Sequence, residues 1–296
     1  MPAPITPQRA MLARRLRELR AAAFPSGSAL ARHLGWHQTR VSKLEQGNQR
    51  PTDDDLDQWA EAVGASQEQL EELRELASAA RIEYATFGQR YRRHGGAVAE
   101  QETTTREDAA STRIAEFQPA LVPGLLQTAA YARDVLTRPC GPASAGVTPD
   151  EIDALVGKRM ERQQALYQPH QNIQIIMGEA ALHTRFGTTE TLIGQLDRLL
   201  ALTDYAHVEI GVIPFTAAMP VFPLTNFILY DDHVLIESLT AQQRLDAADE
   251  INAYANYFQQ LKDAALTGHE FKKLLLRISA ALRAEDTAVR PRTGDT

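Results

Sequence analysis

Residues 26–50 contain the polar side chains whose types and spacing best suit recognition chemistry. We expect two short helices there, separated by a turn at Gly35, with the second over about residues 37–46. Val41 and Leu44 of the second helix would point into a core. Its outward face would then carry amide, hydroxyl and cationic groups, which can hydrogen-bond base edges in a DNA major groove. These groups belong to Gln38, Thr39, Arg40, Ser42 and Lys43.

Three further helices are expected to hold this pair in place, over about residues 7–22, 52–63 and 66–81. Leu12, Leu16 and Leu19 form one apolar stripe on the first of them. Ser26 is a good N-cap for the first helix of the pair, over 27–34, and Thr52 begins the helix over 52–63 with a capping-box pattern. The sequence therefore predicts a small five-helix head.

The distribution of charge supports an anionic partner for this head. The net charge of the whole chain is −7, yet residues 9–50 contain nine Arg or Lys and only two acids, Glu18 and Glu45. The local charge is therefore +7, and the remainder of the chain carries −14. Phosphate binding depends on local charge rather than on the charge of the whole protein.

The bulk composition narrows the class of protein. At 296 residues with 44% apolar content, the chain can form about two packed domains. No run approaches the roughly 18 apolar residues of a membrane helix, and the N-terminus lacks a signal-peptide pattern. A single cysteine, Cys140, excludes internal disulfides and a Cys-rich zinc site. We expect a soluble cytoplasmic, nucleoid-associated protein that holds no metal and no cofactor.

Three short motifs in the head, LARHLGW (30–36), TRVSKLEQG (39–47) and the following RP (50–51), resemble the helix-turn-helix family of phage-repressor and Cro type, also called XRE-like. The resemblance covers about residues 9–64 and implies a lambda-repressor-like fold. It implies an ion pair between Arg20 and Glu45, and the family usually has Gln where this chain has Gly27. The base-reading positions of the family correspond to Gln38, Thr39, Ser42 and Lys43.

Phosphate contacts are expected around the recognition helix. Arg50 and the backbone near Asn48 directly follow that helix, where the DNA backbone would pass. The full set of residues predicted to contact phosphate is Arg14, Ser28, Arg40, Asn48 and Arg50.

A second set of motifs begins near residue 110: EFQPALVPGLLQTAAYAR (116–133), GEAALHTRFG (178–187), GVIPF (211–215) and VLIESL (234–239). Together they resemble the C-terminal domain, long labelled as of unknown function, of actinobacterial Scr1-type antitoxin-like transcriptional regulators. The resemblance implies a homodimeric regulator of a double-stranded DNA operator. It also implies a small partner protein, encoded by an adjacent gene, that changes the affinity for DNA.

Hydrophobic periodicity predicts the organisation of the rest of the chain. Strands are expected near residues 173–177 and 208–213, with an antiparallel hairpin over 224–239 and two helices after it. The fold class is then mainly α with an α+β C-terminal domain, in which helices flank a mixed or antiparallel sheet. The predicted divisions are a helix-turn-helix domain (1–65), a connecting helical segment (66–110), a regulatory and dimerisation domain (111–284) and a flexible tail (285–296).

Two stretches of the larger domain could contact a partner or ligand. One is the turn of the long motif, with Pro123, Gly124 and Gln127, although a role in defining the fold competes with contact. The other is the apolar loop 214–223, with Met219, Val221 and Phe222, which could be a packed lid or a partner surface.

The sequence contains no glycine-rich phosphate loop, no G-x-S-x-G and no H-E-x-x-H, so we expect no enzyme. Glu179, His183 and Arg185 form the most suggestive polar cluster, and an exposed ion pair is its commoner meaning. Three hypotheses remain: a regulator controlled by a small protein, a regulator with a small-molecule pocket, and an enzyme tethered to a DNA-binding head.

Overall fold

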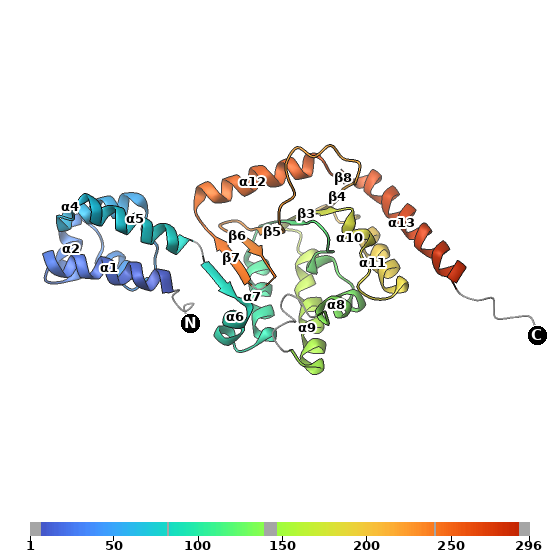
Figure 1. Cartoon of the computed structure of the whole chain (residues 1–296), viewed down its shortest axis with the longest axis horizontal. Coiled ribbons are helices and arrows are strands. Elements are labelled where there is room, and N and C mark those ends of the chain that lie inside the picture. Colours follow the sequence, from blue (N-terminus) through green and yellow to red (C-terminus); the bar gives the residue numbers. More distant parts are fainter. Residues whose placement is uncertain (1–6, 82, 139–146, 240, 290–296) are drawn as a thin grey trace, which may run out of the picture. The chain divides into compact units, whose positions relative to one another are not determined.

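The computed structural model describes residues 7–81, 83–138, 147–239 and 241–289 (Figure 1). Cys140 and residues 290–296 lie outside this range. The chain divides into two compact units, which we call the head (residues 1–83) and the body (residues 84–296). No helix among the described residues is long and apolar enough to cross a membrane.

The head consists of α1 (Pro7–Ala23), α2 (Gly27–Leu34), α3 (Gln38–Glu45), α4 (Asp53–Val63) and α5 (Gln67–Arg81). Side chains from all five helices meet in one core, which includes Leu16, Leu30, Val41, Trp59 and Leu73, each at most 1% exposed. The five-helix head predicted from the sequence is therefore confirmed.

Local signals set the ends of these helices. Ser26 Oγ accepts a hydrogen bond from Ala29 N at 3.2 Å at the start of α2, which satisfies a free backbone donor. Gly35 ends α2 with φ 66°, a left-handed conformation that glycine adopts without strain. Thr52 and Asp55 exchange hydrogen bonds at the start of α4, as the capping-box pattern predicted.

The predicted connecting segment 66–110 does not exist as a separate element. α5 packs into the head through Leu73, Ala77 and Ala80. The body begins just after it, with α6 (Phe87–His94) and α7 (Ala97–Ala110). The apolar side of α5 is thus buried in the core of the head.

The body is built on an eight-stranded mixed sheet with the strand order β1-β7-β6-β5-β2-β3-β4-β8. Strands β2, β3 and β4 are parallel, and the described pairings of β5, β6, β7 and β8 are antiparallel. The bounds are β1 (Glu83–Thr86), β2 (Arg113–Gln118), β3 (Asn172–Gly178), β4 (Val208–Ile213), β5 (Phe227–Leu229), β6 (Val234–Glu237), β7 (Ala241–Leu245) and β8 (Leu266–Thr267).

Helices cover both faces of this sheet, as expected for an α+β domain (Figure 1). The other helices of the body are α8 (Ala129–Leu136), α9 (Pro149–Arg162), α10 (Ala180–His183), α11 (Thr189–Leu202), α12 (Ala248–Asp263) and α13 (Gly268–Val289), with 3-10 turns η1 (Gly124–Leu126) and η3 (Gln163–Tyr167).

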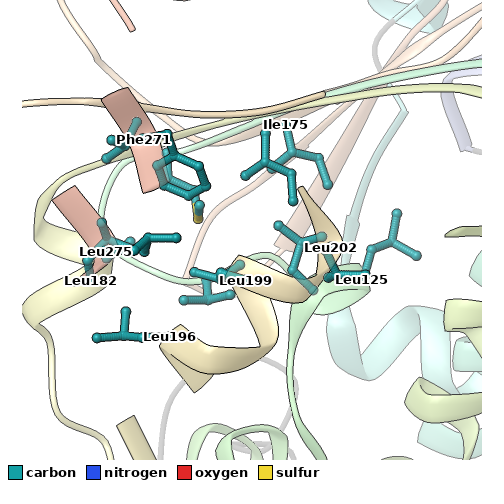
Figure 2. Close-up of a cluster of buried hydrophobic side chains, with 14 of the residues drawn as sticks. Leu125, Ile175, Leu182, Leu196, Leu199, Leu202, Phe271 and Leu275 are labelled. Carbon is teal, nitrogen blue, oxygen red and sulfur yellow. The ribbon is translucent and has the colours of Figure 1, made fainter. Parts of the chain in front are cut away.

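On one face, Ile175 of β3 packs with Leu125, Leu196, Leu199 and Phe271, which come from η1, α11 and α13 (Figure 2). On the opposite face, α12 packs through Phe258 and Leu261 against Phe117 and Phe227. The mixed sheet flanked by helices confirms the predicted fold class.

Three local predictions for the body differ from the structure. Residues 113–118 form the central strand β2, which ends in the first three residues of the long motif and which the sequence pattern did not reveal. Residues 241–245 form strand β7, which the sequence pattern did not predict, and the following helix begins at Ala248. α13 continues to Val289, so the first five residues of the predicted flexible tail are helical.

Candidate functional site

The outward face of α3 is the main candidate site in the head. Val41 and Leu44 are 0% and 1% exposed, so they fix one side of the helix in the core. Gln38, Thr39 and Lys43 are exposed on the other side. The structure therefore leaves an amide, a hydroxyl and an ammonium group open to a partner on one short helix.

Two of the predicted base-reading residues have local hydrogen-bond partners. His37 is the N-cap of α3, and its Nδ1 accepts from Thr39 N at 3.3 Å and lies 2.9 Å from Thr39 Oγ1. Ser42 is half-buried, and its Oγ accepts from Gln46 Nε2 at 3.1 Å. His37 is exposed and was missed because histidine is not among the residues usually favoured at an N-cap.

The predicted ion pair is present and clamps α3 to α1. Arg20 Nε donates to Glu45 Oε1 at 2.7 Å, and Arg20 Nη2 donates to Glu45 Oε2 at 3.3 Å. The two side chains are only 13% and 12% exposed. Arg17 Nη2 also donates to the main-chain oxygen of Glu45 at 2.5 Å, so two arginines hold the end of α3.

Replacing Glu45 with alanine should destabilise the head by about 1–3 kcal/mol, because Arg20 would be left largely buried without its carboxylate. Both tryptophans, Trp36 and Trp59, lie in the head, so urea unfolding followed by tryptophan fluorescence measures this effect. Glu68→Ala, an exposed acid on α5, is the control and should change stability by less than about 0.5 kcal/mol. A Glu45→Ala transition equal to that of the control would contradict a structural role.

The Arg40 side chain is 40% exposed and makes its contacts within the head. Arg40 Nη2 pairs with Asp55, whose side chain is 1% exposed, and the guanidinium lies 4.2 Å from the centroid of the Trp36 ring. The same carboxylate caps α4 by accepting from Thr52 N at 2.9 Å. Arg40 therefore ties α3 to α4, and its contact with phosphate stays a prediction.

The other residues predicted to contact phosphate differ in exposure. All three guanidinium nitrogens of Arg50 are buried, so this side chain does not present its charge to DNA. Asn48 is exposed, and its Nδ2 donates to Gln46 Oε1 at 3.1 Å. Ser28 is exposed at the start of α2, and Arg14 is exposed on α1, with Nε 3.6 Å from Glu18 Oε1. These last three remain predicted phosphate contacts.

The glycine that departs from the helix-turn-helix pattern is the first residue of α2 and faces α3. A β-carbon at Gly27 would stand 3.3 Å from Val41 Cγ1 and 3.7 Å from Glu45 Oε2. The missing side chain therefore permits a close approach of the two helices, beside the ion pair that anchors α3.

In the body, the residues predicted as a partner or ligand surface fall in two separate places. Pro123 and Gln127 are buried, so they cannot form a surface for a protein partner. Gln127 Nε2 donates to Val122 O at 2.7 Å, and its Oε1 accepts from Arg159 Nη1 at 2.9 Å. Gly124 and Gln127 instead line a cavity of about 580 Å³.

The apolar loop between β4 and β5 is the second place. Phe222 is 82% exposed and Met219 is 39% exposed, whereas Val221 packs partly against the core cluster beside α12. Tyr257 Oη donates to the main-chain oxygen of Phe222, which fixes the loop against α12. Exposed aromatic side chains on an anchored loop are typical of contact surfaces.

The polar cluster near residue 180 has a structural explanation. His183 Nε2 lies 3.4 Å from Glu179 Oε1, and Glu179 Oε2 accepts from Phe215 N at 2.8 Å. Arg185 Nη2 donates to Glu285 Oε2 at 2.6 Å instead of joining them. No group of three or more potential metal ligands occurs among the described residues.

Glu116 is the functional candidate that the sequence reading missed. It lines the same cavity, is 3% exposed, and lies on the inward face of β2. Burial raises the pKa of Glu116 to about 7, and nearby Arg162 partly opposes that rise. A lone acid within the apolar pattern of residues 113–118 was the available signal.

Replacing Glu116 with glutamine should stabilise the body more at pH 8 than at pH 5. Because its pKa is raised, folded Glu116 keeps a proton that the unfolded chain has lost, so wild-type stability falls as pH rises from about 4.5 through 7. The difference should be on the order of 2 kcal/mol. All eight tyrosines lie in the body, so urea unfolding by tyrosine fluorescence measures it. An equal effect at both pH values would contradict the raised pKa.

Two family models match the chain. One, described as "Domain of unknown function (DUF5753)", matches residues 101–277, and the other, described as "Helix-turn-helix domain", matches residues 11–73. No curated protein sequence matches.

Among solved structures, the archaeal chromatin protein TrmBL2, described as showing a novel mode of DNA binding, is 11% identical with a TM-score of 0.31. That alignment covers 87% of this chain and 93% of that chain. A likeness at this TM-score carries no argument about this chain.

The first match spans more than half of the 296 residues and includes β2 to β8 and most of the residues that line the cavity. The second includes the exposed face of α3 and the helices that anchor it. The chain therefore belongs to the DUF5753 family and carries an N-terminal helix-turn-helix domain.

Proposed function

We propose that this protein is a sequence-specific transcription regulator that reads its operator through α3. The observation that carries the proposal is the exposure of Gln38, Thr39 and Lys43 on a helix whose Val41 and Leu44 are fully buried. Glutamine can pair with adenine, lysine can reach guanine, and a threonine methyl can contact thymine. Binding selection from random DNA duplexes tests this, because a non-specific binder would enrich no motif.

The regulator is proposed to act as a homodimer, assembled through the body. Helix-turn-helix dimers bind two half-sites about one DNA turn apart, so the selected motif should be an inverted repeat with that spacing. Sedimentation of the full chain with and without the selected duplex measures the assembly directly. One chain bound to a single asymmetric site would contradict the dimer.

An antitoxin-like mode of control is proposed for the body. A small protein encoded by the neighbouring gene would bind the apolar loop, where Phe215, Phe222 and Leu224 are 70%, 82% and 84% exposed. Apolar side chains this exposed on one loop suit a protein partner.

The partner proposal is tested by measuring operator affinity with and without the co-expressed neighbouring protein. Phe222→Ser should abolish the change while leaving the affinity of the regulator alone unaltered. The control is Leu276→Ser, a 58% exposed leucine on α13, which should leave the change intact. If the neighbouring protein leaves operator affinity unchanged in the wild type, this mode of control is wrong.

Control by a small molecule is the second candidate, and the cavity of about 580 Å³ favours it. This volume lies in the range of ligand pockets, about 300–1,000 Å³. In both candidates the body acts by binding rather than by catalysis. A ligand that binds the cavity and changes operator affinity without the neighbouring protein would support the second candidate over the first.

A further inference from the structure

The cavity lined by Gly124 and Gln127 is also lined by arginines, and three of these differ in whether a carboxylate is hydrogen-bonded to them. Arg90 Nε donates to Glu100 Oε1 at 2.6 Å, so this cation has its counter-charge. Arg162 pairs with the buried carboxylate of Asp108. Because both arginines are already paired with carboxylates, neither is expected to attract an anionic ligand.

Arg159 differs from the other two arginines. Its Nη1 donates to the neutral amide of Gln127 at 2.9 Å, and its Nε is buried with no hydrogen-bond partner. Burial and the neighbouring Arg162 lower the pKa of Arg159 to about 10, so it still carries its charge at neutral pH. Arg159 is half-buried, and burying its Nε without a hydrogen-bond partner is costly, so an incoming anion would relieve that cost.

Glu116 supplies a second unsatisfied group in the same cavity. Its Oε1 accepts from Gln118 Nε2 at 3.3 Å, whereas its Oε2 is buried with no partner, on a side chain that is only 3% exposed. When this carboxyl is protonated, it can donate a hydrogen bond as well as accept one. Arg159 Nε and Glu116 Oε2 are therefore two buried polar atoms in the cavity to which a polar group of a ligand could hydrogen-bond.

We propose that the cavity binds a small apolar monocarboxylate whose carboxylate accepts hydrogen bonds from Arg159 and from the protonated carboxyl of Glu116. The apolar part of the molecule would lie against Leu121, Leu155 and Phe227, which line the remaining wall. This inference rests on the second candidate function, control by a small molecule, and specifies the chemical class of that molecule. A guanidinium fork matches the geometry of a carboxylate, and the site would exclude water around that contact.

The charges around Glu116 determine how binding should depend on pH. Asp108 of α7 and Glu237 of β6 raise the pKa of Glu116, Arg162 of α9 lowers it, and burial brings it to about 7. Arg159 of α9 also interacts with this carboxylate. A bound carboxylate would favour protonated Glu116, so binding should weaken about tenfold between pH 6 and pH 8. A zwitterion with an ammonium facing Glu116 would show the opposite dependence.

The test uses the full chain and the fluorescent apolar anion 8-anilinonaphthalene-1-sulfonate as a reporter. Three competitors share one skeleton: 4-phenylbutanoate, 4-phenylbutanamide and the zwitterion 2-amino-4-phenylbutanoate. The carboxylate should displace the reporter at least about tenfold better than the other two at pH 6. Equal displacement by the amide, stronger displacement by the zwitterion, or no displacement by the carboxylate would overturn the proposal.

Two variants locate the site. Arg159→Gln keeps an N–H donor but removes the charge. It should weaken binding of the carboxylate competitor at least about tenfold. Glu116→Gln keeps a donor and should retain binding while losing the pH dependence, so it remains informative if the first variant misfolds. The control is Arg106→Gln, a 75% exposed arginine on α7, which should behave as the wild type. A Glu116→Gln variant that keeps the wild-type pH dependence would also overturn the proposal.

The reporter is also titrated against Phe222→Ser, so that any fluorescence from reporter bound at the exposed loop is measured separately from the competition. Operator affinity of the unliganded chain is measured in parallel. Intact operator binding with failed competition rejects only the ligand class. Successful competition with no effect on operator affinity rejects small-molecule control and leaves the binding site in place.

Discussion

Replacing Gln38 or Lys43 with alanine is expected to weaken binding to the selected operator by about 1–3 kcal/mol for each residue. Both side chains are exposed on α3, and the helix itself is anchored by Val41, Leu44 and the clamp on Glu45. Truncation should therefore remove base contacts without moving the helix. Each change should also relax the preference for one base pair, because a side chain that reads a base discriminates only at that position.

The measurement is a fluorescence-anisotropy titration of the wild-type and variant chains, at one fixed salt concentration, on the operator and on single-base variants of it. Gln67→Ala, an exposed glutamine at the start of α5, is the matched control and should leave the affinity unchanged. Operator binding by Gln38→Ala and Lys43→Ala equal to that of the control would mean that another face of the head contacts the bases.

The head could be predicted closely because its signals are local. The cap at Ser26, the left-handed glycine at Gly35 and the capping box at Thr52 each involve residues within four positions of one another. The apolar positions Val41 and Leu44 follow the helical period, so the outward face of α3 follows by elimination. Such features depend little on the rest of the fold.

The contacts of the long arginine side chains in the head could not be predicted from local sequence. Arg40 lies on the outward face by sequence, yet its guanidinium turns back to Asp55, fifteen positions along the chain, and to the ring of Trp36. Arg50 follows the recognition helix, yet its charged nitrogens are buried. A flexible side chain can reach several partners, and only the tertiary arrangement decides among them.

The body was harder to predict because its central contacts are distant in sequence. Strand β2 pairs with β3, where Ile114 lies beside Ile173, so its role depends on residues about sixty positions away. The cavity brings Glu116 of β2 together with Arg159 of α9. No spacing in the sequence links these two residues, and the missing hydrogen-bond partners that distinguish them are visible only in three dimensions.

Asp108→Ala should destabilise the body by about 3–5 kcal/mol, a large change for one substitution. The Asp108 side chain is fully buried, and its carboxylate pairs with Arg162 and accepts from Tyr230 Oη at 2.7 Å. Removing it leaves a buried cation and a buried hydroxyl without their acceptor. The main-chain oxygen of the same residue accepts from Gln171 Nε2 at 2.6 Å, so α7 itself should keep this anchor.

The distribution of aromatic residues makes the test specific to one unit. Tryptophan fluorescence reports only the head, through Trp36 and Trp59, whereas the tyrosine signal reports only the body. Urea unfolding of Asp108→Ala should therefore shift the tyrosine transition and leave the tryptophan transition in place. Arg106→Ala, whose exposed pair with Glu102 lies on the same helix, should shift neither by more than about 0.5 kcal/mol. A tyrosine transition within about 1 kcal/mol of the wild type would show that the Arg162 pair stabilises the body far less than its burial implies.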